Sequence, residues 1–199
     1  MNTKRDAVLN TLRHKGIVRA RDFAPLGVSP GYLNKLAAQG YIAQSGRGMY
    51  RMPDADFTEN HSLVQVAAYS RDCVICLLSA LQFHQLTTAM PHVVWLAIRE
   101  GSFAPQVPDL VTQIVRMTAK GFEAGIEHHV LEGVDVKIYS AAKTVTDCFK
   151  FRSSVGMEIA IDALKEGLSK RRFSPADLYD FAVINRVWNV MQPYIEALS

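Results

Sequence analysis

A short stretch near the N-terminus, Val28-Ser29-Pro30-Gly31-Tyr32-Leu33-Asn34-Lys35-Leu36, decides the interpretation of the fold. Ser29 belongs to the residue types that cap helices, and Pro30 suits the first helical position, whose amide has no partner inside the helix. The leucines recur at helical spacing, so we expect them to face a core. The stretch therefore predicts a helix that begins at Pro30 and ends near Gly40. Its outward side chains are Tyr32, Asn34, Lys35 and Gln39.

The segments on either side complete the pattern of one small domain. A first helix is expected from Thr3, with Gly16 ending it. Residues 19–23 predict a short second helix. After the quoted stretch, two alternating segments flank Ser45-Gly46-Arg47-Gly48, whose glycines suit the tight turn of a hairpin. This order predicts a winged helix-turn-helix domain over residues 1–52.

Such a domain is typical of proteins that bind double-stranded DNA. The second helix of the turn places its N-terminal side chains in the major groove, and the wing reaches the neighbouring backbone or minor groove. A winged helix that serves only protein contacts is the alternative. The candidate DNA-binding residues are Arg19, Ser29, Tyr32, Asn34, Lys35, Arg47 and Arg51.

Charge is divided unevenly along the chain. The 199 residues carry a formal charge of +3, but residues 1–52 hold nine Lys or Arg against two Asp, which gives +7. Residues 53–199 sum to −4. This asymmetry indicates that the first part meets a polyanion. A solvated basic face without a partner is the other interpretation, and charge alone does not decide between them.

The rest of the chain, residues 53–199, is predicted to form a separate α+β domain after a short acidic linker, Pro53-Asp54-Ala55-Asp56. Helical periodicity comes first, extended segments follow, and helices close the chain, which is the order of an α+β fold. Glu132-Gly133 predicts a hairpin turn. The expected helices cover residues 61–70, 74–86, 140–151, 155–168, 175–181 and 187–197, and the expected strands cover 93–98, 110–117, 126–131 and 134–139.

The closing helices resemble a known family. The segments that carry the likeness are Ala142-Lys143-Thr144-Val145-Thr146-Asp147-Cys148-Phe149-Lys150-Phe151-Arg152, residues 163–168 and residues 190–198. The hairpin over residues 46–50 and the helix around Ser79-Ala80-Leu81 fit the same pattern, so the likeness covers nearly the whole chain. The sequence is similar to the AbiEi family, which contains antitoxins and transcriptional regulators of type IV toxin-antitoxin systems in abortive infection.

The resemblance implies a repressor that binds inverted repeats in its own promoter. It also implies that the second domain opposes a toxin similar to nucleotidyltransferases without forming a stable toxin complex, and that the protein is not an enzyme and needs no cofactor. The run Lys170-Arg171-Arg172 is interpreted either as charge at a helix C-terminus, which the helix dipole favours, or as a second nucleic-acid patch. The candidate antitoxin surface comprises Lys150, Arg152, Lys170, Arg171 and Arg172.

A different class of function fits another pattern. Pro108-Asp109, followed by Asp135-Val136-Lys137, matches the arrangement of metal-dependent nucleases, in which two carboxylates hold Mg²⁺ and a lysine orients water or stabilises developing charge. Asp135 beside Gly133 is equally typical of a turn. The alternative function is therefore a Mg²⁺-dependent nuclease with a winged-helix targeting domain.

Other polar groups are interpreted as structural. Cys73 and Cys76 have the spacing of metal ligands but lie in an apolar stretch, so we expect buried thiols. Lys143 and Asp147 lie four residues apart on an expected helix, which is the spacing of a surface ion pair.

Composition excludes several classes of protein. With 49% hydrophobic and 21% charged residues, the chain is close to average globular usage. Its longest apolar runs, residues 73–78 and 93–98, fall far short of the roughly 18 to 20 residues that span a bilayer. The polar N-terminus lacks the apolar stretch of a signal peptide, and three cysteines fit a reducing compartment. We therefore expect no membrane segment and a cytoplasmic location.

Overall fold

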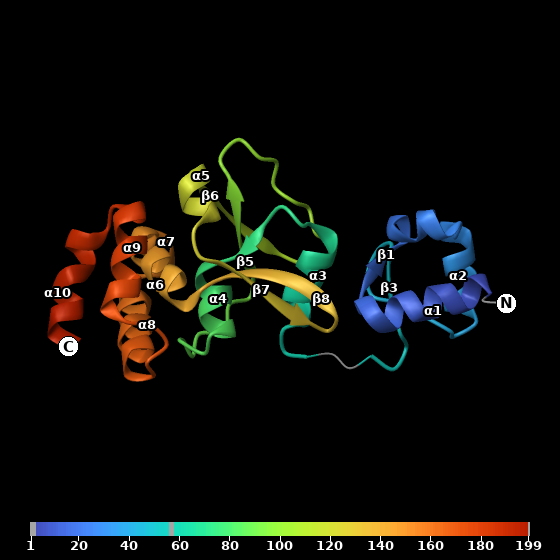
Figure 1. The fold of residues 1–199 in the computed structure, drawn as a ribbon, viewed down its shortest axis with the longest axis horizontal. Helices are drawn as coiled ribbons and strands as arrows, with labels where there is room; N and C mark the ends of the chain where they lie inside the picture. Colours follow the sequence, from blue (N-terminus) through green and yellow to red (C-terminus); the bar gives the residue numbers. More distant parts are fainter. Residues whose placement is uncertain (1–2, 56–57, 199) are drawn as a thin grey trace. The chain divides into compact units, whose positions relative to one another are not determined.

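The computed structural model describes residues 3–55 and 58–198 (Figure 1). It confirms the expected α+β class, because N-terminal helices precede a mixed sheet and further helices close the chain. The chain divides into two compact units. The first contains the chain up to Arg71 with residues 105–110 and 129–136, and the second contains the rest. Asp56 of the expected linker lies outside the described residues.

The first unit begins with a helix at the expected position, α1 (Lys4–Lys15). The Thr3 hydroxyl accepts a hydrogen bond from the Asp6 amide, and the Asp6 carboxylate accepts one from the Thr3 amide, so the two side chains close a capping box. Gly16 ends the helix, as expected. The other helical elements of this unit are η1, a 3₁₀ helix (Ala20–Leu26), α2 (Pro30–Ala38) and α3 (His61–Tyr69).

Within the described residues, a sheet with the strand order β1-β3-β2 completes the winged helix. Its strands are β1 (Val18–Arg19), β2 (Ala43–Gln44) and β3 (Met49–Arg51). Both pairings are antiparallel, and Tyr50 lies between Val18 on one side and Gln44 on the other. The expected hairpin is confirmed as β2 and β3. The sequence pattern does not indicate β1, because two residues cannot show an alternation.

One hydrophobic cluster fills this unit. The two leucines of the quoted stretch lie in it, which confirms the expected core face of α2. Its buried members include Val8, Leu12, Phe23, Leu33, Leu36, Ile42 and Tyr50.

A second sheet has the strand order β6-β5-β4-β8-β7 among the described strands. Its strands are β4 (Val74–Ile75), β5 (Val94–Arg99), β6 (Thr112–Met117), β7 (Ile126–Leu131) and β8 (Val134–Tyr139). β5 and β6 run parallel, and β4 pairs antiparallel with β5 and parallel with β8. The expected turn at Glu132-Gly133 joins β7 to β8.

The expected helix over residues 74–86 is wrong at its start. Val74 and Ile75 form β4, and α4 (Leu77–Phe83) begins only after them. β4 is the middle strand of its sheet, and both of its residues are buried. A short apolar run has the same appearance in a buried strand and in a buried helix, so periodicity does not separate the two.

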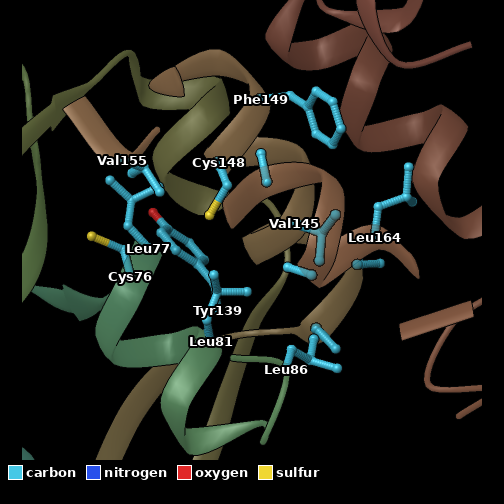
Figure 2. Close-up of a cluster of buried hydrophobic side chains, with 14 of the residues drawn as sticks. Cys76, Leu77, Leu81, Leu86, Tyr139, Val145, Cys148, Phe149, Val155 and Leu164 are labelled. Atoms are coloured by element: carbon cyan, nitrogen blue, oxygen red, sulfur yellow. The ribbon is translucent and has the colours of Figure 1, made fainter. Parts of the chain in front are cut away.

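The second unit closes with helices packed around α6 (Ala141–Lys150). The Ser140 hydroxyl accepts from the Lys143 amide, which confirms the expected cap of α6. α4, α8 and α9 contact α6, and Figure 2 shows Val145, Cys148 and Phe149 of this helix within the buried cluster. The remaining helices are α5 (Ala119–Glu123), α7 (Arg152–Val155), α8 (Met157–Ser169), α9 (Pro175–Asn185) and α10 (Trp188–Leu198).

The expected surface ion pair on α6 is wrong. Lys143 and Asp147 are both fully buried. Lys143 Nζ donates to both carboxylate oxygens of Asp147, and Asn185 Nδ2 donates to Asp147 Oδ1 at 2.7 Å. Their spacing is that of a surface pair, but neighbouring helices cover α6, which four-residue spacing cannot reveal.

Candidate nucleic-acid interface

The N-terminus of α2 is built by local sequence. Ser29 lies in extended conformation, and its hydroxyl accepts a hydrogen bond from the Tyr32 amide at 3.3 Å. Pro30 occupies the first turn, where its missing amide costs no hydrogen bond. Both features confirm the expected start of the helix. The N-terminal end of a helix carries partial positive charge, which favours a nearby phosphate.

The outer side of α2 carries three of the candidate residues. Asn34 and Lys35 are exposed, whereas Tyr32 is half-buried and packs against the core of the first unit. Asn34 Oδ1 accepts a hydrogen bond from the Tyr50 hydroxyl at 2.6 Å. The structure therefore presents a carboxamide and an ammonium group to solvent from one short helix.

Arg47 lies at the exposed tip of the hairpin between β2 and β3. The turn is tight because Gly46 and Gly48 have φ angles of 121° and 71°, which side-chain-bearing residues rarely adopt. The Ser45 amide donates to the Met49 carbonyl at 2.9 Å and closes the hairpin. In winged helices, a basic side chain at the wing tip is in a position to contact DNA phosphates, and Arg47 occupies that position.

Two other candidate residues make contacts within the protein. Arg19 Nη1 donates to the Tyr69 carbonyl at 2.7 Å, and its Nε lies 3.4 Å from an Asp22 carboxylate oxygen. Arg51 Nη1 donates to three main-chain carbonyl oxygens, those of Met52, Pro53 and Ala55. Arg19 thus binds the end of α3, and Arg51 binds the segment that follows β3. Their contact with DNA stays a prediction.

Sequence reasoning missed the role of Tyr50. Its side chain is only 3% exposed, and it reaches from β3 to Asn34 on α2. The alternation of residues 49–52 marks a wing strand, but it does not say which residue on another element a tyrosine hydroxyl meets. The contact between this strand and α2 depends on tertiary packing.

The candidate antitoxin residues lie at two places in the second unit. Lys150 Nζ donates to Asn185 Oδ1 at 3.4 Å, and Arg152 Nη1 donates to the Phe149 carbonyl at 2.9 Å. Arg152 and the run of residues 170–172 are exposed.

The basic run ends one helix and contacts the end of another. Lys170 Nζ donates to the Gln85 carbonyl at 3.1 Å, and Arg172 Nη2 donates to the His84 carbonyl at 3.2 Å, just after α4 ends. These bonds support the interpretation of the run as charge at a helix C-terminus, although the carbonyl groups follow the end of α4 and are not those of α8.

The residues of the nuclease pattern lie in two settings. Asp109 is exposed in a turn with a φ angle of 63°. Asp135 and Lys137 alternate on β8 with the buried Val136, so they point to the opposite side of the strand from the core. Among residues 3–55 and 58–198, no group of three or more His, Cys, Asp or Glu side chains lies close enough together to hold a metal ion.

The cysteines are buried, as expected for Cys73 and Cys76. Burial raises the pKa of the Cys76 and Cys148 thiols well above the usual range, so they stay protonated and are poor ligands and nucleophiles.

Comparison with known proteins agrees with the winged-helix geometry. Residues 6–53 match the AbiEi family. The family model is that of AbiEi antitoxin transcriptional regulators. The matched segment contains most of α1, then β1, η1, α2 and the wing, and all seven candidate DNA-binding residues fall within it. The match supports the AbiEi resemblance over residues 6–53.

A solved structure extends the comparison to the whole fold. The chain is similar to the crystal structure of the RV2827C protein from Mycobacterium tuberculosis, with a TM-score of 0.63 and 12% identity over 98% of this chain and 77% of that chain. At this identity, the likeness shows the fold alone. No curated protein matches the chain. Among the described residues, every helix is too short or too polar to cross a membrane.

Proposed function

We propose that the protein is a DNA-binding autorepressor and the antitoxin of a type IV toxin-antitoxin system, which opposes a nucleotidyltransferase-like toxin. Residues 1–52 are the DNA-binding domain in this proposal, and residues 53–199 are the antitoxin domain. The observation that carries the DNA-binding part is the exposed outer side of α2 together with Arg47 at the wing tip, within the segment that matches the AbiEi regulators.

Charge supports DNA as the partner. The net +7 of residues 1–52 contrasts with the −4 of the rest, and neutralising phosphates supplies most non-specific affinity for DNA. In this proposal Lys35 and Arg47 contact phosphates, the Ser29-capped helix start lies near the backbone, and Tyr32 and Asn34 reach base edges. The target is double-stranded DNA with inverted repeats in the protein's own promoter.

The antitoxin part rests on the AbiEi resemblance and match. Its surface includes Lys150, Arg152 and the run of residues 170–172, and it acts without a stable toxin complex. These residues belong to the second unit, so the proposal separates repression from antitoxin activity along the chain.

Binding to the promoter tests the DNA-binding part. The full-length protein is titrated onto a duplex from immediately upstream of its gene and onto an unrelated duplex of equal length. Arg47→Ala with Lys35→Ala should weaken binding to both duplexes and lower the salt slope by about one unit for each phosphate that is no longer neutralised. Lys120→Ala with Lys165→Ala, which removes two exposed charges outside the winged helix, is the matched control. Equal binding by both double variants would contradict the proposal.

Growth rescue separates the antitoxin from the alternative nuclease. Cells that express a nucleotidyltransferase-like toxin of such a system should be rescued by the wild type and equally by Asp109→Ala with Lys137→Ala, because the proposed antitoxin activity is not catalytic. Mg²⁺-dependent cleavage of DNA or RNA that disappears in this double variant would establish the nuclease instead.

A further inference from the structure

A hydrogen bond between α2 and the wing strand β3 joins side chains of opposite exposure. The Tyr50 hydroxyl, on a side chain that is 3% exposed, donates to Oδ1 of the exposed Asn34 at 2.6 Å. Asn34 is at the same time a candidate for reading base edges. A buried hydroxyl therefore contacts an exposed polar group.

The Tyr50 ring is held from several sides. Its backbone lies in the central strand, between Val18 and Gln44, and its ring belongs to the core cluster of the first unit. The next residue, Arg51, is tied to the carbonyl groups that follow it. Burial raises the pKa of the Tyr50 hydroxyl, so this group is neutral and able to donate at physiological pH.

A carboxamide held in this way presents its two ends differently. Its oxygen accepts hydrogen bonds, and its nitrogen donates two. Because Oδ1 of Asn34 is directed to Tyr50, Nδ2 lies on the other branch of the planar group. Without the hydroxyl, the carboxamide rotates between two broad orientations and offers either end.

We infer that Tyr50 is a positioning residue for DNA recognition, which fixes Asn34 with Nδ2 as the group that meets a base edge. The inference rests on the proposed function and deepens it. The chemistry that Nδ2 recognises is a pair of neighbouring acceptors in the major groove, and guanine presents such a pair at N7 and O6. The two-point contact of asparagine with adenine also uses Oδ1 as an acceptor, and Tyr50 already occupies part of that oxygen.

The test selects bound sequences from a pool of duplexes in which each position of the promoter fragment is randomised in turn. Full-length wild type, Tyr50→Phe, Asn34→Asp and Tyr41→Phe are compared. Tyr41→Phe is the matched control, because Tyr41 is an exposed tyrosine of the same unit whose ring stacks on Arg5 and stays in place without its hydroxyl.

The wild type should prefer guanine at one position of each half-site. Tyr50→Phe should reduce that preference by about threefold to tenfold, the equivalent of one hydrogen bond, and leave the other positions unchanged. Affinity for unrelated DNA should stay within about twofold, since phosphate contacts set it. A purely structural role of Tyr50 would lower affinity for all sequences together.

Asn34→Asp keeps the acceptor for Tyr50 and turns the outward donor into an acceptor. Selection at the same position should then move from guanine to a base with an exocyclic amino group, cytosine or adenine. This variant tests the inference even if Tyr50→Phe is unstable.

Besides a uniform loss of affinity in Tyr50→Phe, two results would overturn the inference. If Asn34→Asp changes the selected base while Tyr50→Phe has the wild-type profile, Asn34 reads DNA without help from Tyr50, and the proposed function stands. If the wild type selects no sequence at all, the proposed function fails and the inference fails with it.

Discussion

Lys143 and Asp147 form an ion pair in which both side chains are fully buried, one turn apart on α6. Asn185 from α9 supplies a further hydrogen bond to the carboxylate, and Lys143 Nζ lies 4.4 Å from the centre of the Tyr139 ring. Removing two charges from water costs several kcal/mol for each ion, and the mutual contacts compensate only while both partners are present.

Single replacements in this pair should therefore be strongly destabilising. Asp147→Asn leaves a buried ammonium group without its counter-charge and should lower the free energy of unfolding by about 3 to 5 kcal/mol. The double variant Lys143→Met with Asp147→Leu buries no charge and should be more stable than Asp147→Asn. Urea unfolding followed by circular dichroism measures both. A double variant that is no more stable than Asp147→Asn would contradict this account.

Two glycines should respond to alanine in opposite ways. A Cβ atom on Gly167 of α8 would lie 2.1 Å from the Phe173 ring, so Gly167→Ala should cost about 1 to 3 kcal/mol through overpacking. A Cβ on Gly31 of α2 meets open space, so Gly31→Ala should stabilise by up to about 1 kcal/mol. Thermal unfolding of the two variants checks this difference in sign. Equal shifts of the two thermal midpoints would mean that helix propensity alone decides the effect of alanine at both positions.

The basic run of residues 170–172 contains its own control. Lys170→Ala with Arg172→Ala removes the hydrogen bonds to the carbonyl groups that follow α4 and should cost about 0.5 to 2 kcal/mol. Arg171→Ala should be neutral, because alanine meets the same backbone strain as arginine at a φ angle of 51°. If Arg171→Ala leaves stability unchanged but impairs rescue from the toxin, the run belongs to the antitoxin surface. Full rescue by all three replacements together would remove the run from that surface.

Acid should weaken the first unit through Glu132. Burial raises the pKa of this carboxyl, but hydrogen bonds from Thr58 and His61 outweigh that effect and hold the pKa below its ordinary value of 4.5. The unfolded chain then binds a proton at higher pH than the folded chain. The contribution to stability is present above the ordinary value and is lost as the pH falls through the lowered one.

The measurement is the thermal midpoint between about pH 6 and pH 3. Glu132→Gln should reduce the loss of stability on acidification, whereas Glu158→Gln, at an exposed glutamate of α8, should leave it unchanged. The same pH dependence in Glu132→Gln and in the wild type would show that other carboxylates set the acid limit.

The sequence by itself determined the helix caps and turns of this protein, because each of them depends on residues that are close together in the chain. The Ser29 cap, the glycine turn around Arg47 and the Ser140 start of α6 are each set within three or four positions, so residue types alone predict them. The concentration of positive charge before residue 53 is likewise a property of the sequence.

Tertiary structure decided what depends on residues far apart in the chain. It placed Val74 and Ile75 in a central strand and surrounded Lys143 and Asp147 with other helices. It also joined Arg19 to the carbonyl of a residue 50 positions away and left Arg47 exposed, although both are arginines of the same basic segment. Burial and hydrogen bonding follow from the packing of distant elements, and neither hydrophobic periodicity nor charge contains that information.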